Sequence, residues 1–134
     1  MAGRVSGNLL DTSVLIAHDE IEALELPETA AISVITLGEL RAGVLIAGDA
    51  RLAEARHRRL AGVRATFTPL IVDEAVADHY GELLAIARSQ GRAAKATDLL
   101  IIATAAATDR ELYTLDTAQA RLAEAAGVRA VPLR

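Results

Sequence analysis

Short apolar segments alternate with longer amphipathic segments along the chain, and this alternation constrains the fold more than any other feature. Short apolar runs between turn residues are typical of buried strands, whereas apolar residues spaced three and four apart are typical of helices. The pattern predicts strands at residues 9–10, 30–35, 68–72, 112–115 and 128–131. It predicts helices at residues 36–47, 50–60, 74–89, 99–107 and 117–125.

Strands that alternate with helices predict an α/β fold, in which a central parallel sheet is covered by helices on both faces. Gly48, Asp49 and Gly91 are expected to end helices. The 134 residues contain no repeat or linker-like tract, so we expect a single three-layer α/β/α domain that spans residues 1–134.

The composition excludes several classes of site. There is no cysteine, which excludes disulfides, thiolate zinc sites and cysteine nucleophiles, and which fits a cytoplasmic protein. The three aromatic residues are too few for the stacking platforms of many single-strand binders. The first residues do not resemble a signal peptide, and no apolar run reaches the ~18 residues of a membrane span.

Four acidic residues are predicted to meet at one edge of the sheet. Ligands bind such sheets beyond the carboxyl ends of the strands. Asp11 follows the first predicted strand, and Asp116 follows the fourth. Glu39 lies one turn into the helix after the second strand, and Asp98 precedes a helix that is apolar on every face.

Each of these acids also has an explanation that requires no ligand. Asp11, Asp98 and Asp116 are all suitable helix N-caps, and Gln119 stands three residues after Asp116, as in a capping box. Glu39 could be an ordinary surface glutamate.

The four acids taken together favour a metal site. Two like charges about 4 Å apart repel by roughly 4 kcal/mol at an effective dielectric constant near 20, so such a cluster needs a balancing cation. Oxygen-only ligands select a hard ion, Mg²⁺ or Mn²⁺. A carboxylate-held ion with open water positions suits the hydrolysis of phosphodiesters.

The sequence resembles the PIN-domain nucleases, and within them the VapC-like toxins of bacterial toxin–antitoxin pairs. Four blocks in order carry the resemblance: LLDTSVLI, TLGELRAG, KATDLLIIATA and LYTLDT. It implies an endoribonuclease that uses Mg²⁺, or Mn²⁺ in its place, and hydrolyses RNA with metal-activated water. It also implies a homodimer whose active site is blocked by a cognate VapB-like antitoxin.

The resemblance assigns roles by motif. Asp11, Glu39 and Asp98 become catalytic acids, with Asp11 and Asp98 as metal ligands and Ser13 supporting the first Asp. The fourth block departs from a common form of the pattern, in which Thr is followed by Asn two residues on and by Asp five residues on. Asp116 takes the nearer position here and Gln119 the farther one, so we predict Asp116 as the fourth acid, with Thr114 in support.

The remaining charged residues allow more than one interpretation. The net charge is −4, yet residues 41–64 hold six arginines against two acids. The arginine-rich helix could present a solvated face, with Leu52, Ala55, Leu60 and Val63 turned inward, or it could contact RNA or the antitoxin. The histidines at positions 18, 57 and 79 share no metal-binding spacing and are expected to be ordinary helix or surface residues.

Two other functions are compatible with parts of the sequence. A phosphotransferase of the haloacid-dehalogenase type needs a second Asp two residues after Asp11, where this chain has Ser13. The main alternative is a catalytically silent PIN-fold module that binds RNA or protein.

Overall fold

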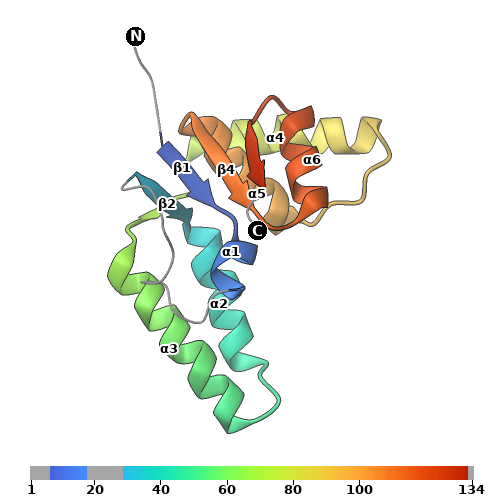
Figure 1. Ribbon diagram of the computed structural model, residues 1–134. Coiled ribbons are helices and arrows are strands. Elements are labelled where there is room, and N and C mark those ends of the chain that lie inside the picture. Colours follow the sequence, from blue (N-terminus) through green and yellow to red (C-terminus); the bar gives the residue numbers. More distant parts are fainter. Residues whose placement is uncertain (1–6, 18–28, 133–134) are drawn as a thin grey trace.

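The structure is a computed structural model that describes residues 7–17 and 29–132. Its centre is a sheet of five parallel strands in the order β3-β2-β1-β4-β5 (Figure 1). The strands are β1 (Gly7–Leu10), β2 (Ala30–Ser33), β3 (Pro69–Leu70), β4 (Arg110–Thr114) and β5 (Ala130–Pro132). The predicted parallel sheet is therefore confirmed.

Six helices accompany the sheet in the described part of the chain. They are α1 (Thr12–Ile16), α2 (Val34–Leu45), α3 (Ala50–Thr66), α4 (Glu74–Ser89), α5 (Ala96–Ala107) and α6 (Thr117–Ala125). No helix in this part of the chain is long and apolar enough to cross a membrane.

Strand β1 lies in the middle of the sheet and pairs in parallel with β2 on one side and β4 on the other. The register pairs Leu10 with Tyr113, so β1 and β4 end side by side although they are far apart in sequence. Residues that directly follow these two strands must therefore meet at the same edge of the sheet.

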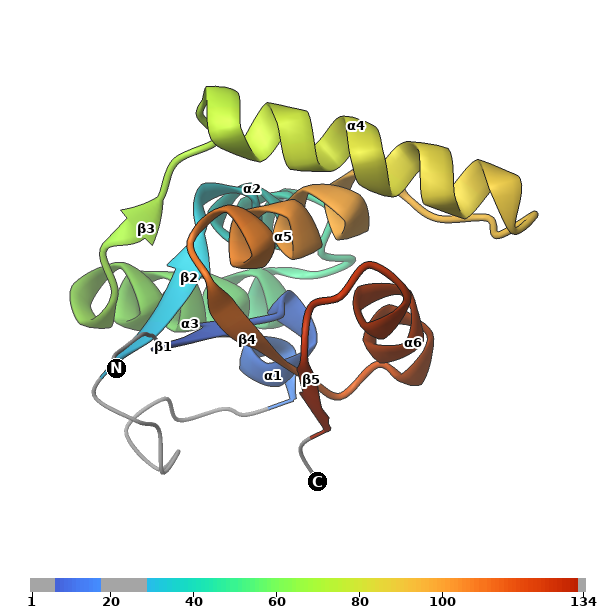
Figure 2. The same cartoon turned by 90° about the horizontal axis from the view of Figure 1, so that it is seen from above.

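Alternating side chains along the strands build two separate cores. Leu9, Ala31 and Leu112 face one cluster, which contains buried residues of α4, α5 and α6. Leu10 and Ile32 face the other cluster, together with buried residues of α1, α2 and α3. Figure 2 shows α5 between α4 and the strands. Helices thus cover both faces, which gives the predicted three layers.

Helices α2 and α3 form a hairpin that extends away from the sheet (Figure 1). Its turn contains Gly48 and Asp49, and Asp49 caps α3 by accepting from the Leu52 N–H at 2.8 Å. Farther along, the Arg56 guanidinium donates to the Gly43 carbonyl at 2.7 Å and fastens the two helices together.

Several predicted boundaries are wrong, each for a local reason. Strand β2 ends at Ser33 because the Ser33 hydroxyl accepts from the Ile35 N–H at 3.0 Å and caps α2. Helix α3 continues to Thr66 rather than ending at residue 60, and the short α1 was not predicted. Helix α5 begins at Ala96, three residues before the predicted start at residue 99, so that Asp98 lies inside its first turn.

Candidate active site

Asp11 is buried where β1 ends, with 5% of its surface exposed. It occupies the N-cap position of α1, but its side chain does not cap that helix. Its Oδ2 instead accepts from the Ser13 hydroxyl at 2.7 Å and from the Thr114 hydroxyl at 2.8 Å. The cap interpretation of Asp11 is therefore wrong, and two hydroxyls fix this carboxylate at the edge of the sheet.

The same two hydroxyls also hold the chain that follows β4. Ser13 Oγ accepts from the Leu115 N–H, and Thr114 Oγ1 accepts from the Asp116 N–H, each at 3.0 Å. Because each hydroxyl donates to Asp11 and accepts from the backbone, its hydrogen-bonding geometry is defined on both sides.

Glu39 is half-buried on α2 and is positioned from α1. The Thr12 hydroxyl donates to Glu39 Oε1 at 2.7 Å. Thr12 has one hydroxyl proton, so the 2.9 Å contact between Thr12 Oγ1 and Thr36 Oγ1 requires Thr36 to be the donor. Glu39 is thus the end of a chain of hydroxyls and not an ordinary surface residue.

Asp98 shows that the four acids share one electrostatic environment. Burial is the main cause that raises its pKa above the ordinary value, followed by the charges of Asp11 and Glu39 and, more weakly, Asp116. The ammonium group of Lys95 lowers the pKa but does not cancel these effects. Lys95 also holds the N-cap position of α5, so Asp98 is not the cap that one interpretation predicted.

Asp116 is exposed and does cap a helix. Its Oδ1 accepts from the N–H groups of Ala118 at 2.9 Å and Gln119 at 3.2 Å, which confirms the cap interpretation. The capping box is not formed as predicted, because the Gln119 side chain donates to the Asp98 carbonyl at 3.0 Å instead. Gln119 therefore links the start of α6 to the first turn of α5.

The donor set fits a hard cation that keeps much of its water. Asp11 and Asp98 could supply carboxylate oxygens to such an ion, and the pKa of Asp98 is raised by its burial and by the neighbouring acids. Within residues 7–17 and 29–132, no three acidic or histidine side chains form a ready-made metal-ligating group. Mg²⁺ is commonly held by one or two carboxylates plus water, so two carboxylates are enough for a magnesium site.

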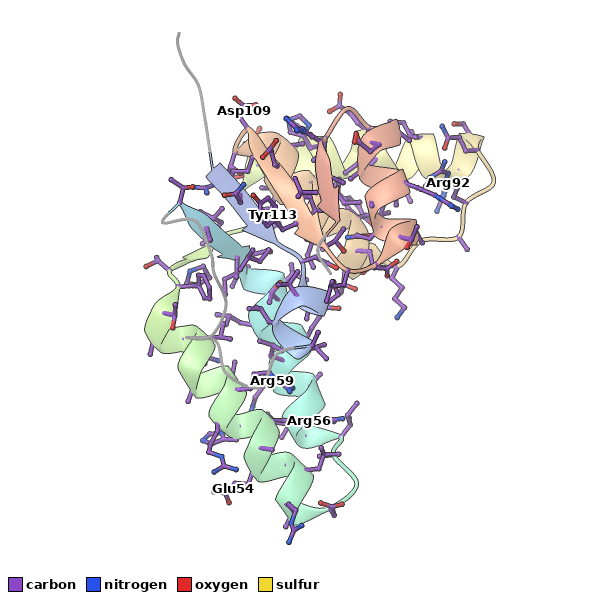
Figure 3. The ribbon with its side chains drawn as sticks, in the orientation of Figure 1. Glu54, Arg56, Arg59, Arg92, Asp109 and Tyr113 are labelled. Atoms are coloured by element: carbon purple, nitrogen blue, oxygen red, sulfur yellow. The ribbon has the colours of Figure 1, made fainter. Side chains whose placement is uncertain are left out.

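A groove of about 460 Å³ opens beside Glu39, between α1, α2 and α3. Exposed apolar side chains line it: Ile16 on α1, Ile46 after α2 and Leu52 on α3. Arg56 and Arg59 also line the groove and lie on the side of α3 that faces α2 (Figure 3).

The arginine-rich helix is not simply a solvated face. Leu60 and Val63 are buried as predicted, but Leu52 and Ala55 are exposed, while Arg56 and Arg59 are half-buried. His57 is exposed and His79 contacts Glu82 on its own helix at 3.2 Å, as expected of helix-surface residues. His18 lies outside the described residues.

The sequence patterns missed the roles of Thr12 and Thr36, and they assigned Gln119 to a capping box rather than to its contact with α5. Thr12 directly follows Asp11, and Thr36 lies about one helical turn before Glu39. A hydroxyl next to a predicted acid is a signal that the sequence contains. No local pattern identifies the observed contact of Gln119, since its partner is a backbone carbonyl 21 residues away.

Comparison with known proteins places the chain in a family. The family model of the PIN domain matches residues 9–125. Ribonuclease VapC8 of Mycobacterium tuberculosis is 45% identical over 106 residues, which cover 77% of this chain and 94% of that protein. Ribonuclease VapC5 of the same species is 34% identical over 134 residues and is covered to 98%.

The fold agrees with this assignment. The crystal structure of VapBC-5, a toxin–antitoxin system of M. tuberculosis, matches with a TM-score of 0.81 and 35% identity. The match covers 95% of this chain and 98% of that one. The chain therefore belongs to the PIN-domain family, among its VapC-like members.

Proposed function

We propose that this protein is a metal-dependent endoribonuclease and the toxic component of a toxin–antitoxin pair. The observation that carries the proposal is the placement of the acids at one edge of the sheet, where the Ser13 and Thr114 hydroxyls fix the buried Asp11 at 2.7 and 2.8 Å. The raised pKa of Asp98, caused by burial and by the charges of the other three acids, agrees with this placement. Its relatives named as ribonucleases support the choice of RNA as substrate.

In this proposal Asp11 and Asp98 hold Mg²⁺ or Mn²⁺. A bound ion would lower the pKa of a coordinated water and neutralise charge on the phosphoryl oxygens. The hydroxyls of Ser13 and Thr114 fix the orientation of the Asp11 carboxylate by donating to its Oδ2 at 2.7 and 2.8 Å. Asp116, held by its capping bonds, adds negative charge at the rim of the site.

Glu39 is proposed as the group that takes the proton of the attacking water. Thr12 occupies Oε1 with its 2.7 Å bond, which orients the carboxylate and leaves Oε2 for water. The attack on phosphorus would then leave a 5′-phosphate and a 3′-hydroxyl, because the site is built from acids: of the histidines that the structure describes, His57 is exposed on α3 and His79 contacts Glu82 on α4.

The test is cleavage of single-stranded RNA with Mg²⁺, with Mn²⁺ and with excess EDTA, followed by analysis of the product ends. Cleavage should require the metal, and Asp11→Asn should abolish it. Products with 2′,3′-cyclic phosphates, or full activity in EDTA, would contradict the mechanism. A silent module would instead show no cleavage with either ion.

A VapB-like antitoxin is the proposed partner. An arginine from its C-terminal segment would compensate the clustered carboxylates much as a metal does. The exposed side chains of Ile16, Ile46 and Leu52 would be covered by apolar residues of the same segment. The similarity to the VapBC-5 structure, described as a toxin–antitoxin system, supports an antitoxin as the partner.

Co-expression with the neighbouring small reading frame tests the partner. A basic antitoxin should co-purify, and expression of the toxin alone should arrest growth of the host. Harmless expression without any co-purifying partner would argue against the toxin assignment.

A further inference from the structure

We propose that a second cavity, beside the acidic site, binds one nucleotide of the RNA next to the phosphate that is cut. This inference rests on the ribonuclease function proposed above. The cavity has a volume of about 580 Å³ and lies between α6, the start of β5, the chain after β4 and the segment between α4 and α5. Cavities of this size commonly hold one small ligand.

The cavity adjoins the acidic site and shares two residues with it. Thr114 and Asp116 line it, and the Thr114 hydroxyl is the group that binds Asp11 at 2.8 Å. An RNA strand whose phosphate lies near Asp11 therefore has this cavity as the adjoining space for its next nucleotide.

Two arginines supply charge for a phosphate. Arg92, on the segment between α4 and α5, and Arg121, on α6, both line the cavity and are exposed (Figure 3 labels Arg92). Among the residues that the structure describes, neither arginine side chain makes a hydrogen bond or an ion pair. A guanidinium without a protein partner is available for a bidentate contact with phosphate.

Three other arginines are already engaged. Arg56 donates to the Gly43 carbonyl, Arg110 donates to the Thr29 carbonyl, and Arg129 pairs with Glu111. Arg92 and Arg121 differ from these three because their guanidinium groups have no partner in the described part of the chain.

The rest of the lining suits a base better than a free anion. Leu115, Ala120, Ala125 and Ala130 provide an aliphatic surface. Glu124 is held on the wall by the Ala130 N–H at 3.3 Å and can accept from a base N–H group. With Glu124 and Asp116 also present, the cavity is not broadly basic, so a ligand needs both a phosphate at the arginines and a base on the aliphatic side.

The experiment measures binding of a fluorescent single-stranded RNA in EDTA, where no metal-dependent cleavage occurs, across a series of salt concentrations. We expect the double variant Arg92→Ala/Arg121→Ala to bind at least tenfold more weakly than wild type. Each lost phosphate contact should lower the log–log salt slope by about 0.7, which gives about 1.4 for the pair. The matched control is Arg64→Ala, because Arg64 is also exposed but lies on α3 and does not line the cavity.

A second variant tests the base-binding part without changing charge. Ala120→Leu fills the cavity from a half-buried position on α6 and keeps a good helix former. It should weaken binding while leaving the salt slope unchanged. Circular dichroism and melting curves establish that each variant is folded.

The results separate this inference from the proposed function. If wild type binds no RNA in EDTA, or if the double variant keeps the wild-type affinity and slope, the nucleotide site is wrong even where Mg²⁺-dependent cleavage is found. If the slope falls as expected but no RNA is cut under any condition, the nucleotide site stands and the nuclease proposal fails.

Discussion

Asp11 is an acid whose position depends on two neutral neighbours. Its carboxylate is buried, and hydrogen bonds to a charged group contribute about 1.5–3 kcal/mol each. The hydroxyls of Ser13 and Thr114 therefore compensate much of the cost of burying this charge at the end of β1.

Thr114→Val should reduce both stability and cleavage. Valine keeps the branched shape but removes the donor to Asp11, so the free energy of unfolding should fall by about 1–3 kcal/mol. Cleavage should fall at least tenfold because Asp11 is less well fixed. Thr104→Val is the control in urea melts, since the buried Thr104 hydroxyl only donates to the Leu100 carbonyl of its own helix. Equal losses in both variants would show that Asp11 does not depend on Thr114.

Asp98→Asn should abolish cleavage yet stabilise the metal-free protein. Aspartate in the first turn of α5 gains from the helix dipole, but its raised pKa indicates that burial and the neighbouring acids outweigh this gain. Because Asp98 is half-buried and partly screened, the gain in stability should not exceed about 1 kcal/mol. Mg²⁺ should raise the melting temperature of wild type and much less that of the variant. Identical melting temperatures with and without Mg²⁺ in both proteins would contradict a metal site at Asp98.

The same pair of proteins should respond differently to pH without metal. The pKa of Asp98 is higher in the folded than in the unfolded protein, so folding favours its protonated form. The loss of stability caused by the ionised Asp98 carboxylate is absent below the pKa of this group in the unfolded protein. It grows as the pH rises through the pKa of Asp98 in the folded protein. The stability advantage of Asp98→Asn should therefore be full at pH 7 and shrink as the pH falls toward about 4. An advantage that is constant with pH would exclude this electrostatic origin.

For single residues, the sequence placed acids at one edge of the sheet but did not predict the hydroxyls that hold them. Asp11 and Asp116 follow strands that a parallel sheet must bring together, so their proximity follows from the alternation of elements. The bond between Thr12 and Glu39 joins α1 to α2 across 27 residues, and depends on side-chain geometry that no local pattern contains.

At the scale of elements, types were easier to predict than ends. Helix α2 begins at Val34 because the Ser33 hydroxyl caps it, although the apolar run from residue 30 continues to residue 35. Helix α5 takes in Ala96 and Thr97 before its apolar run begins. The start of α2 is thus set by a side-chain cap, whereas α5 begins before its apolar run without one. Apolar periodicity reports only the packed middle of an element.

The α2–α3 hairpin gives a prediction about the antitoxin. Ile46 is 78% exposed on the groove beside Glu39, and Ile71, on the chain after β3, is 67% exposed and away from it. Ile46→Lys should weaken antitoxin binding at least tenfold, which corresponds to about 1.4 kcal/mol, while Ile71→Lys should not. Isothermal titration with the purified antitoxin measures the difference. Equal affinities would mean that the antitoxin does not use this groove.

At the scale of the whole molecule, the expected homodimer can be measured directly. Sedimentation equilibrium of the purified toxin without its antitoxin should give twice the 14.1 kDa mass of the chain. A single 14.1 kDa species at micromolar concentration would argue against a stable dimer.

The order of the strands in the sheet determines when the acidic site can assemble during synthesis on the ribosome. The hydroxyl that holds Asp11 belongs to Thr114, 103 residues later, and its strand β4 must insert beside β1 before the two can meet. A nascent chain that has emerged only as far as α4 contains Asp11 and Glu39 but neither Asp98 nor Asp116. Nuclease activity is thus postponed until translation is nearly finished, so incomplete chains released from a stalled ribosome should leave RNA intact.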